Sequence, residues 1–220
     1  MDLVTEFGNI LSLSMLKKIY DKYSSVELLK KKLRIEPYTT LTRVSGIGFK
    51  KADDIILTLQ KEKVIDFGYD VKTSADRCLA CMLYLLGENE NNGNTKMSLP
   101  ELRSQCLKTV KECAHHFVDA VKDENIYYSK ETMDVALRKT YEAEVYICEK
   151  FKEALSKHIS WDIDYKYYKY IDGFELTDKQ NEVLNMVCNN NVSILIGYAG
   201  AGKSTSMKAL VKMLDDNKKS

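Results

Sequence analysis

The residues with the clearest chemical potential lie between Gly197 and Thr205, in the stretch GYAGAGKST. This stretch fits the pattern G-x-x-x-x-G-K-[ST] in full. Glycines in such a loop let successive backbone amides turn towards phosphate oxygens, and the following helix directs its positive end at the same anions. We therefore expect nucleotide to be bound by Gly197, Tyr198, Ala199, Gly200, Ala201, Gly202, Lys203, Ser204 and Thr205.

Two side chains of this loop are the candidate catalytic residues. Lys203 is placed to neutralise charge on the β- and γ-phosphates, and the Ser204 hydroxyl is placed to ligate Mg²⁺ that arrives with the nucleotide. ATP and Mg²⁺ are thus the expected cofactors. The alternative is a glycine-rich turn without a ligand, but Lys-Ser directly after the last glycine then has no packing purpose.

Gln180 lies on the predicted helix upstream of this loop, in the stretch ELTDKQ. Its amide offers a donor and an acceptor, which suit N6 and N7 of adenine. The spacing Thr177-x-x-Gln180 also fits a capping box, in which Gln180 bonds back to the Thr177 amide. The position before a phosphate-binding loop favours the adenine role.

A second candidate site lies in TRVSGIGFKKAD, a tight hairpin between two predicted helices. Two glycines in such a hairpin let backbone amides face successive phosphates of one DNA strand. Residues 17–63 hold 12 Lys/Arg and 6 Asp/Glu, although the whole chain has a net charge of only +1. The alternative is a hairpin that only packs, with solvated lysines. The expected DNA-binding residues are Arg43, Gly46, Ile47, Gly48, Lys50 and Lys51.

The predicted elements give a mainly α chain. We expect helices over the first 65 residues, with Ser24-x-x-Glu27 as a capping box, and a helix from about residue 73 that ends before the exposed loop GENENNGNTK. A second capping box at Ser98-x-x-Glu101 and a possible β-hairpin in ENIYYSKETMDVAL suggest a winged-helix region. A long amphipathic helix follows at about 141–156. Near the C-terminus we expect helices at 177–188 and 204–214, and between them a buried strand at 192–196.

These elements suggest four parts: a helix-hairpin-helix region at 1–95, a winged-helix-like region at 96–160, a linker at 161–175 and the start of a RecA-like α/β domain at 176–220. The linker holds Tyr165, Tyr167, Tyr168 and Tyr170. Such rings can stack on bases, but packing against the neighbouring domains is the favoured interpretation.

The composition is that of an ordinary cytoplasmic protein. No apolar run approaches 18 residues, and the first residues lack the pattern of a secretory signal. The 6 cysteines include the pair Cys78-x-x-Cys81, and Cys106, Cys113, His115 and His116 could complete a metal site. The apolar neighbours in RCLACMLYLL favour buried, reduced thiols instead.

The order of these motifs resembles the RecD-like helicases of superfamily 1, of the stand-alone type with an N-terminal extension. The resemblance covers about residues 7–214 and depends on GIGFKKADDI in combination with LTDKQ and GYAGAGKST. It implies an ATP-driven translocase that unwinds DNA in the 5′→3′ direction, acts in repair or recombination, and binds single-stranded or junction DNA without sequence preference. It also implies that Gln180, Lys203 and Ser204 are the family's nucleotide-binding residues. Tyr198, Ala199, Ala201 and Ser204 depart from the family's usual loop.

No Asp-Glu pair and no arginine finger follow the loop. We therefore expect a part of a longer motor that is inactive alone, with a poorly packed C-terminal segment. Two other functions stay open: a non-enzymatic DNA-binding or adaptor module with a vestigial nucleotide site, and a different P-loop ATPase. The sequence identifies no protein partner.

Overall fold

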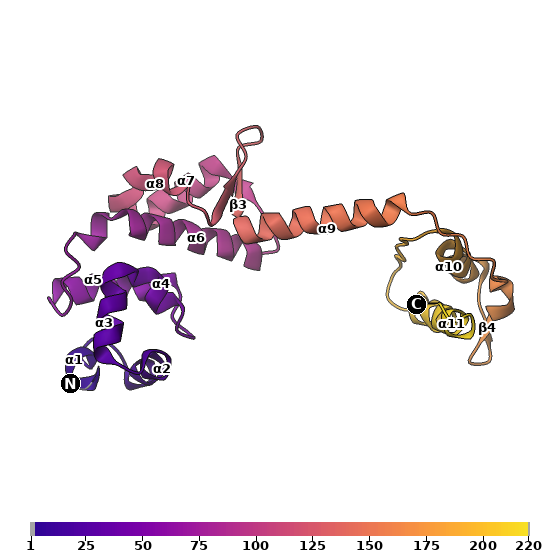
Figure 1. Ribbon diagram of the computed structural model, residues 1–220, viewed down its shortest axis with the longest axis horizontal. Helices are drawn as coiled ribbons and strands as arrows, with labels where there is room; N and C mark the ends of the chain where they lie inside the picture. The colour runs from indigo at the N-terminus through magenta and orange to yellow at the C-terminus, as the bar shows by residue number, and fades with distance from the viewer. Residues whose placement is uncertain (1–2, 220) are drawn as a thin grey trace. The chain divides into compact units, whose positions relative to one another are not determined.

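The computed structural model describes residues 3–219 and confirms a mainly α-helical fold (Figure 1). The chain forms two compact units, Met1–Glu142 and Ala143–Ser220. Helix α9 (Arg138–Ser156) begins in the first unit and continues into the second. No helix in the described part of the chain is both long and apolar enough to cross a lipid bilayer.

The first unit opens with five helices, as the sequence predicted. They are α1 (Leu3–Phe7), α2 (Leu13–Tyr23), α3 (Val26–Ile35), α4 (Pro37–Thr42) and α5 (Phe49–Lys61). The predicted apolar stripe of α5 is buried, with Ala52, Ile56 and Leu59 fully covered. The cap of α3 is Ser25, which accepts from the Leu28 amide, and not Ser24. Ser24 instead ends α2 in the left-handed conformation at φ 55°.

The remainder of the first unit combines helices with a small sheet in the order expected for a winged helix, and it is called the winged helix below. It contains η1 (Val71–Thr73), α6 (Ala75–Asn91), β1 (Met97–Ser98), α7 (Leu99–Thr109), η2 (Lys111–His116), α8 (Phe117–Ala120), β2 (Ile126–Tyr128) and β3 (Asp134–Leu137). The strands form an antiparallel sheet in the order β1-β3-β2, which confirms the predicted β-hairpin. Ser98 caps α7 through the Glu101 amide, as expected. Helix α6 lies between α4 and α5 on one side and α7 and α8 on the other (Figure 1).

Helix α6 is longer than the sequence suggested, because half of the predicted loop GENENNGNTK is helical. The side chain of Asn89 donates to the carbonyls of Asn94 and Lys96 at 3.1 Å each. These bonds hold the short connection against the end of the helix. The polar, glycine-containing composition of this stretch predicts a loop, but its first five residues continue the helix.

The second unit contains, after α9, the elements η3 (Tyr165–Tyr168), β4 (Tyr170–Ile171), β5 (Phe174–Glu175), α10 (Asp178–Asn189) and α11 (Lys203–Asp216). Strands β4 and β5 form a hairpin whose two turn residues, Asp172 and Gly173, have φ values of 52° and 81°. Positive φ at both positions is typical of the two-residue turn that matches strand twist. Helices α10 and α11 pack through a small core that includes Leu184, Ala209 and Met213. The C-terminal helices are therefore packed, contrary to expectation.

The buried strand predicted at 192–196 does not form. These residues are irregular, and Ile194 and Ile196 are 72% and 87% exposed. A strand needs a neighbour to satisfy its backbone N–H and C=O groups. Within residues 3–219, the only strands of this unit are β4 and β5, which pair with each other. The apolar sequence alone could not supply a partner.

Four cysteines of the first unit, Cys78, Cys81, Cys106 and Cys113, are completely buried. The sulfur atoms of Cys78 and Cys106 lie 3.9 Å apart. Contact with the Cys106 thiol, together with burial, raises the pKa of Cys78 to about 12. No three His, Cys, Asp or Glu side chains of the described residues are placed to hold a metal ion.

Candidate phosphate-binding sites

The hairpin between α4 and α5 turns on Gly46, whose φ is +85°. This left-handed conformation favours glycine because it has no Cβ. The side chains of Val44 and Ile47 are buried and anchor the loop to the core. The Ile47 amide donates to the Val44 carbonyl at 3.0 Å, so it is used inside the turn. Ile47 therefore helps to hold the conformation of the loop, whereas the backbone amides that follow it make no hydrogen bond within the described chain.

The start of α5 has no side-chain cap. Gly48 is its N-cap residue, and nothing in the described chain accepts a hydrogen bond from the amides of Gly48, Phe49 or Lys50. Five other long helices begin at a hydroxyl side chain that accepts from the first turn: Ser12 for α2, Ser25 for α3, Ser74 for α6, Ser98 for α7 and Thr177 for α10. Free amides and the positive end of the helix together make the start of α5 suited to an anion.

Lysines surround the hairpin and bind its carbonyls. Lys18 donates to the Ser45 carbonyl at 3.1 Å and Lys22 to the Arg43 carbonyl at 2.6 Å, both from α2. Lys51 reaches the Gly46 carbonyl at 3.5 Å. The ammonium groups thus take the acceptors of the loop, which leaves its donors to an outside ligand. Sequence reasoning missed Lys18 and Lys22, although their spacing of four residues places them on one face of α2.

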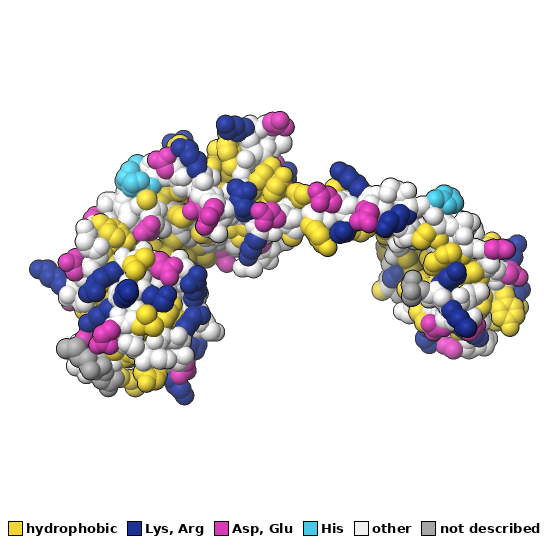
Figure 2. Space-filling view, viewed as in Figure 1, with side chains coloured by type: hydrophobic (Ala, Val, Ile, Leu, Met, Phe, Trp, Pro, Cys, Tyr) yellow, Lys and Arg dark blue, Asp and Glu magenta, His cyan; other side chains and the backbone are white. Residues whose placement is uncertain are grey.

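The other predicted DNA-binding side chains are exposed around the same loop. The Arg43 guanidinium lies 3.8 Å from the Glu36 carboxylate, and the Lys50 ammonium lies 5.8 Å from the centre of the Tyr84 ring. Lys and Arg side chains gather over the N-terminal helices (Figure 2). Residues 70–137, which form the winged helix, hold 8 Lys/Arg and 11 Asp/Glu. Positive charge within the first unit is therefore concentrated on the helix-hairpin-helix side.

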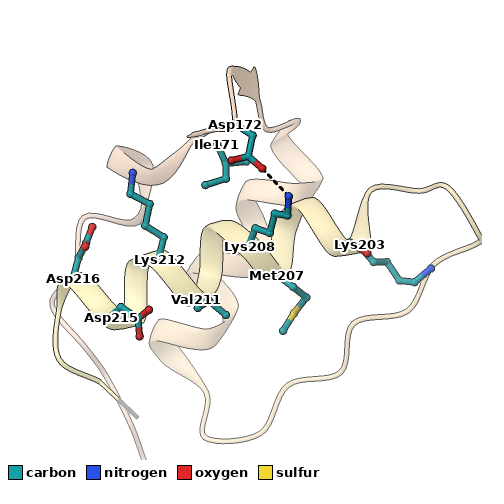
Figure 3. A pocket seen from close by; sticks show the side chains of 10 residues that line it. Ile171, Asp172, Lys203, Met207, Lys208, Val211, Lys212, Asp215 and Asp216 are labelled. Carbon is teal, nitrogen blue, oxygen red and sulfur yellow. Dashed lines mark hydrogen bonds and ion pairs between the residues drawn. The ribbon is translucent and has the colours of Figure 1, made fainter.

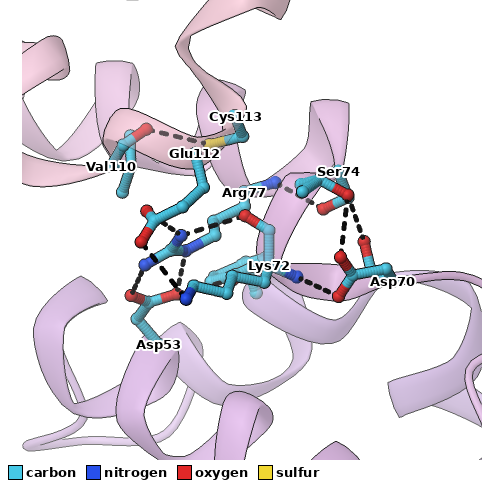
Figure 4. A network of polar contacts seen from close by, with 10 residues as sticks. Asp53, Asp70, Lys72, Ser74, Arg77, Val110, Glu112 and Cys113 are labelled. Atoms are coloured by element: carbon cyan, nitrogen blue, oxygen red, sulfur yellow. Dashed lines mark hydrogen bonds and ion pairs between the residues drawn. The ribbon is translucent and has the colours of Figure 1, made fainter.

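A buried ion pair fixes α5 against the winged helix (Figure 4). Arg77 of α6 donates two hydrogen bonds of 2.9 Å to the two carboxylate oxygens of Asp53 on α5. The same guanidinium donates to the Lys72 carbonyl at 3.0 Å and to Glu112 at 3.1 Å, and the Tyr38 hydroxyl donates to Asp53 at 2.7 Å. Burial raises the pKa of Tyr38, so its phenol stays protonated as a donor. This network holds the helix whose first turn carries the free amides.

The loop predicted to bind nucleotide contains two glycines in the left-handed region. Gly200 and Gly202 have φ values of +77° and +75°. Gly202 is the N-cap of α11, and it provides no side-chain cap, as Gly48 does for α5. Tyr198, Ala199, Ala201 and the two glycines Gly197 and Gly200 are all exposed. The start of α11 is thus a second helix end whose amides are left to an outside acceptor.

The two candidate catalytic side chains fit a nucleotide with its metal. The Lys203 ammonium donates to the carbonyls of Gly197 at 2.6 Å and Tyr198 at 2.7 Å, so it folds back across the loop. The Ser204 hydroxyl is exposed and has no hydrogen-bond partner among the described residues. Lys203 supplies a positive charge that suits phosphate, and Ser204 supplies a free hydroxyl oxygen that suits Mg²⁺. Thr205 follows in the first turn of α11, half-buried.

Gln180 makes the capping box that the sequence left as an alternative, and it also contacts the loop. Its Oε1 accepts from the Thr177 amide at 2.9 Å, and its Nε2 donates to the Gly202 carbonyl at 3.3 Å. Both ends of the amide are engaged, so adenine recognition requires these bonds to be exchanged. The structure thus places Gln180 against the phosphate loop, and its role in adenine binding stays a prediction.

An open groove of about 740 Å³ runs along α11 from Lys203 and Ser204 (Figure 3). Met207 and Val211 form its apolar floor, and the turn of the β4–β5 hairpin covers one side through Ile171 and Asp172. Lys208 donates to Asp172 at 2.7 Å across the groove. The groove continues past this pair along α11, where Lys212, Asp215 and Asp216 line it.

The tyrosine run divides between packing and exposure. Tyr168 is buried and Tyr165 packs against the same core, whereas Tyr167 and Tyr170 are 76% and 56% exposed. Lys169 lies 4.9 Å from the centre of the Tyr170 ring and pairs with Glu175 at 3.1 Å. Packing therefore accounts for two of the four rings.

The first unit thus contains a helix-hairpin-helix, and the second contains a glycine-rich loop with the G-x-x-x-x-G-K-[ST] pattern. Residues 3–96 match the family described as the ATP-dependent RecD2 DNA helicase HHH domain, and residues 175–220 match the family described as the AAA domain. The curated proteins contain no significant match to the chain. The chain thus has the N-terminal region of a RecD-like DNA helicase, and its two domain families indicate a module for DNA and nucleotide binding.

Proposed function

We propose that this chain is the N-terminal part of an ATP-dependent helicase that translocates 5′→3′ on DNA. One observation supports this function above the others. The two long helices that begin at an uncapped glycine, α5 and α11, lie in the two regions that match the helicase hairpin domain and the AAA domain. Each of the two helix ends is suited to phosphate, one on a polynucleotide and one on ATP.

DNA phosphates bind at the amides of Gly48, Phe49 and Lys50, in front of the positive end of α5. Lys18, Lys22 and Lys51 hold the loop carbonyls away from the phosphate and add positive charge. The exposed side chains of Arg43 and Lys50 extend the same surface. Because phosphates carry no sequence information, binding is non-specific and weakens as salt rises.

ATP binds at the loop Gly197–Thr205, with Mg²⁺ held through the nucleotide and Ser204. When bound, the metal neutralises charge on the phosphates. Lys203 exchanges its bonds to the Gly197 and Tyr198 carbonyls for phosphate oxygens. Gln180 exchanges its Gly202 contact for the adenine edge, which couples base recognition to the shape of the loop.

The hairpin is tested with Gly48→Asp, and Gly48→Ala is the matched control. A Cβ at Gly48 meets no atom within 4 Å, so both variants fit the fold. Aspartate is a favoured N-cap and satisfies the amides itself while adding negative charge. We expect the aspartate variant to lose DNA affinity about tenfold or more by fluorescence anisotropy at fixed salt, since hydrogen bonds to charged groups are strong. Alanine should change affinity much less. Equal affinity of all three proteins would refute the phosphate site.

The nucleotide site is tested with Lys203→Met in binding of a fluorescent ATP analogue with Mg²⁺. The variant should lose nucleotide binding but keep DNA binding, because the two sites lie on different helices. In a helicase that contains this region, the same change should abolish strand separation, and the wild type should displace a strand only from substrates with a free 5′ overhang. Unchanged nucleotide binding by the variant would reject the role of Lys203.

A further inference from the structure

A cavity of about 310 Å³ opens directly beside the DNA-binding hairpin. Gly48 and Phe49, at the start of α5, line one end of it. The other walls come from α4 and from one face of α6. Its volume lies at the lower end of the range for pockets that bind small molecules. The cavity therefore begins at the same residues whose amides are free for a phosphate.

A column of aromatic rings forms one wall of this cavity. The rings of Tyr38 and Phe49 are stacked with centres 5.8 Å apart, and those of Phe49 and Tyr84 with centres 5.4 Å apart. Tyr38 and Phe49 are buried, but Tyr84 at the end of the column is half-buried. The Lys50 ammonium lies 5.8 Å from the centre of the Tyr84 ring. A partly open aromatic surface thus lies next to a cation and to the free amides.

We infer that this cavity accepts one unpaired nucleobase of the DNA whose phosphate the hairpin holds. This inference rests on the proposed DNA binding by the hairpin. Base and phosphate belong to one nucleotide, and the cavity starts where the phosphate binds, so a single nucleotide occupies both. Tyr84 supplies the stacking surface, and stacking tolerates any base because every base has a π-face. Thr39 supplies an exposed hydroxyl that can donate or accept, whereas the Thr42 hydroxyl donates to the Tyr38 carbonyl at 2.8 Å and is left as an acceptor.

The charges around the cavity fix the direction in which the nucleotide enters. A smaller hollow of about 120 Å³ shares the Tyr38 and Leu83 walls and ends at the acidic side chains of Glu36 and Asp76. Asp76 repels phosphate there, although Lys32 and Arg43 pair with Glu36 at 3.7 and 3.8 Å, whereas Lys50 and the amides attract phosphate at the opposite end. The phosphate stays at the hairpin and the base points inward. The strand does not continue through the hollow.

The cavity gives this site a preference for DNA with an unpaired end or gap. A base in a duplex is held by its partner and neighbours, and extracting it costs unpairing and unstacking energy. An overhanging base carries little of that cost. The site therefore favours single-stranded and junction DNA over blunt duplex, without reading the sequence.

The test compares three labelled substrates by fluorescence anisotropy at one salt concentration. They are a blunt duplex, the same duplex with a one-nucleotide overhang, and that overhang with an abasic sugar. We expect the overhang with a base to bind about tenfold more tightly than the abasic one. Tyr84→Leu should remove this difference, whereas Tyr84→Phe, which keeps the ring, should retain it. Tyr20→Leu, on an exposed ring of α2, is the matched control and should keep the difference.

A second measurement does not depend on any variant. An overhanging 2-aminopurine should lose fluorescence on binding to the wild-type protein, because it stacks on Tyr84. Equal affinity for the base and abasic overhangs, or no quenching, would overturn the inference even if blunt duplex still binds. Failure of Gly48→Asp to weaken binding to blunt duplex would instead refute the hairpin as a phosphate site, so the two failures are distinguishable.

Discussion

Replacing Arg77 with methionine should lower the unfolding free energy of the first unit by about 3–5 kcal/mol. The change keeps an apolar stem of similar length but removes four hydrogen bonds, two of them to Asp53. The Asp53 side chain is only 13% exposed, so its carboxylate is left with the Tyr38 hydroxyl and little water. A buried charge without its partner is the reason for the large expected loss.

The loss is measured by thermal and urea unfolding followed by far-ultraviolet circular dichroism. For a unit of 142 residues, several kcal/mol correspond to a fall in Tm of about 10 °C or more. Trp161 is the single tryptophan and lies in the second unit, so its fluorescence should report a transition that does not move. Lys122→Met is the matched control, since Lys122 and Asp119 form a pair that is 71% and 81% exposed. It should change stability by less than about 1 kcal/mol.

A double variant separates the cost of leaving the Asp53 carboxylate unpaired from the loss of the Arg77 contacts themselves. Asp53→Leu combined with Arg77→Met should be less destabilised than the sum of the single changes, because no charge remains buried. Arg77→Lys should not restore stability, because an ammonium cannot make the paired bonds to both carboxylate oxygens. A loss below 1 kcal/mol for Arg77→Met, or additive single changes, would refute the argument that Arg77 compensates a buried carboxylate.

Three further predictions follow from single features of the fold. Gly87→Ala should raise stability by about 0.5–1 kcal/mol in urea unfolding, because Gly87 lies inside α6 at an ordinary φ and a Cβ there meets no atom within 4 Å; a destabilised variant would contradict the helical assignment of this stretch. A thiol reagent should label Cys148 alone in the native protein and all 6 cysteines after denaturation, since the other five are buried; rapid native labelling of Cys78 would show that its environment is not closed. Backbone hydrogen bonding and Arg77 lower the pKa of Glu112 from its ordinary 4.5. The stabilisation that the Glu112 carboxylate provides is therefore complete above that pH and is lost as pH falls through the lower pKa of the folded state. Glu112→Gln should flatten the acid side of the profile of stability against pH, and an unchanged profile would show that Glu112 does not contribute.

Features that depend on neighbouring residues were predictable from the sequence. The Ser98 cap, the apolar stripe of α5 and the β2–β3 hairpin all follow from residue types a few positions apart. The cap of α3 was misplaced by one residue because Ser24 and Ser25 offer the same hydroxyl. Only the left-handed turn at the end of α2 decides between them.

Features that depend on distant residues were not predictable in the same way. The strand at 192–196 has the right residues, but a strand is defined by a partner that no local pattern supplies. The Arg77–Asp53 pair joins residues 24 positions apart. Two signals were present in the sequence: Asp53 follows Ala52 on the buried side of α5, and Arg77 begins the apolar run RCLACMLYLL. A charge at a buried position calls for a counter-charge, although it does not say which one.

The glycine starts of α5 and α11 have a consequence for the protein without its ligands. A helix that begins at glycine forgoes a hydroxyl cap, which is worth a few tenths of a kcal/mol to the fold, and leaves its first peptide dipoles facing solvent. A polyanion that binds there completes the helix as any cap would. Oligonucleotide should therefore raise the melting temperature of the first unit, and nucleotide that of the second. The melting temperature of each unit then reports whether its own site is occupied.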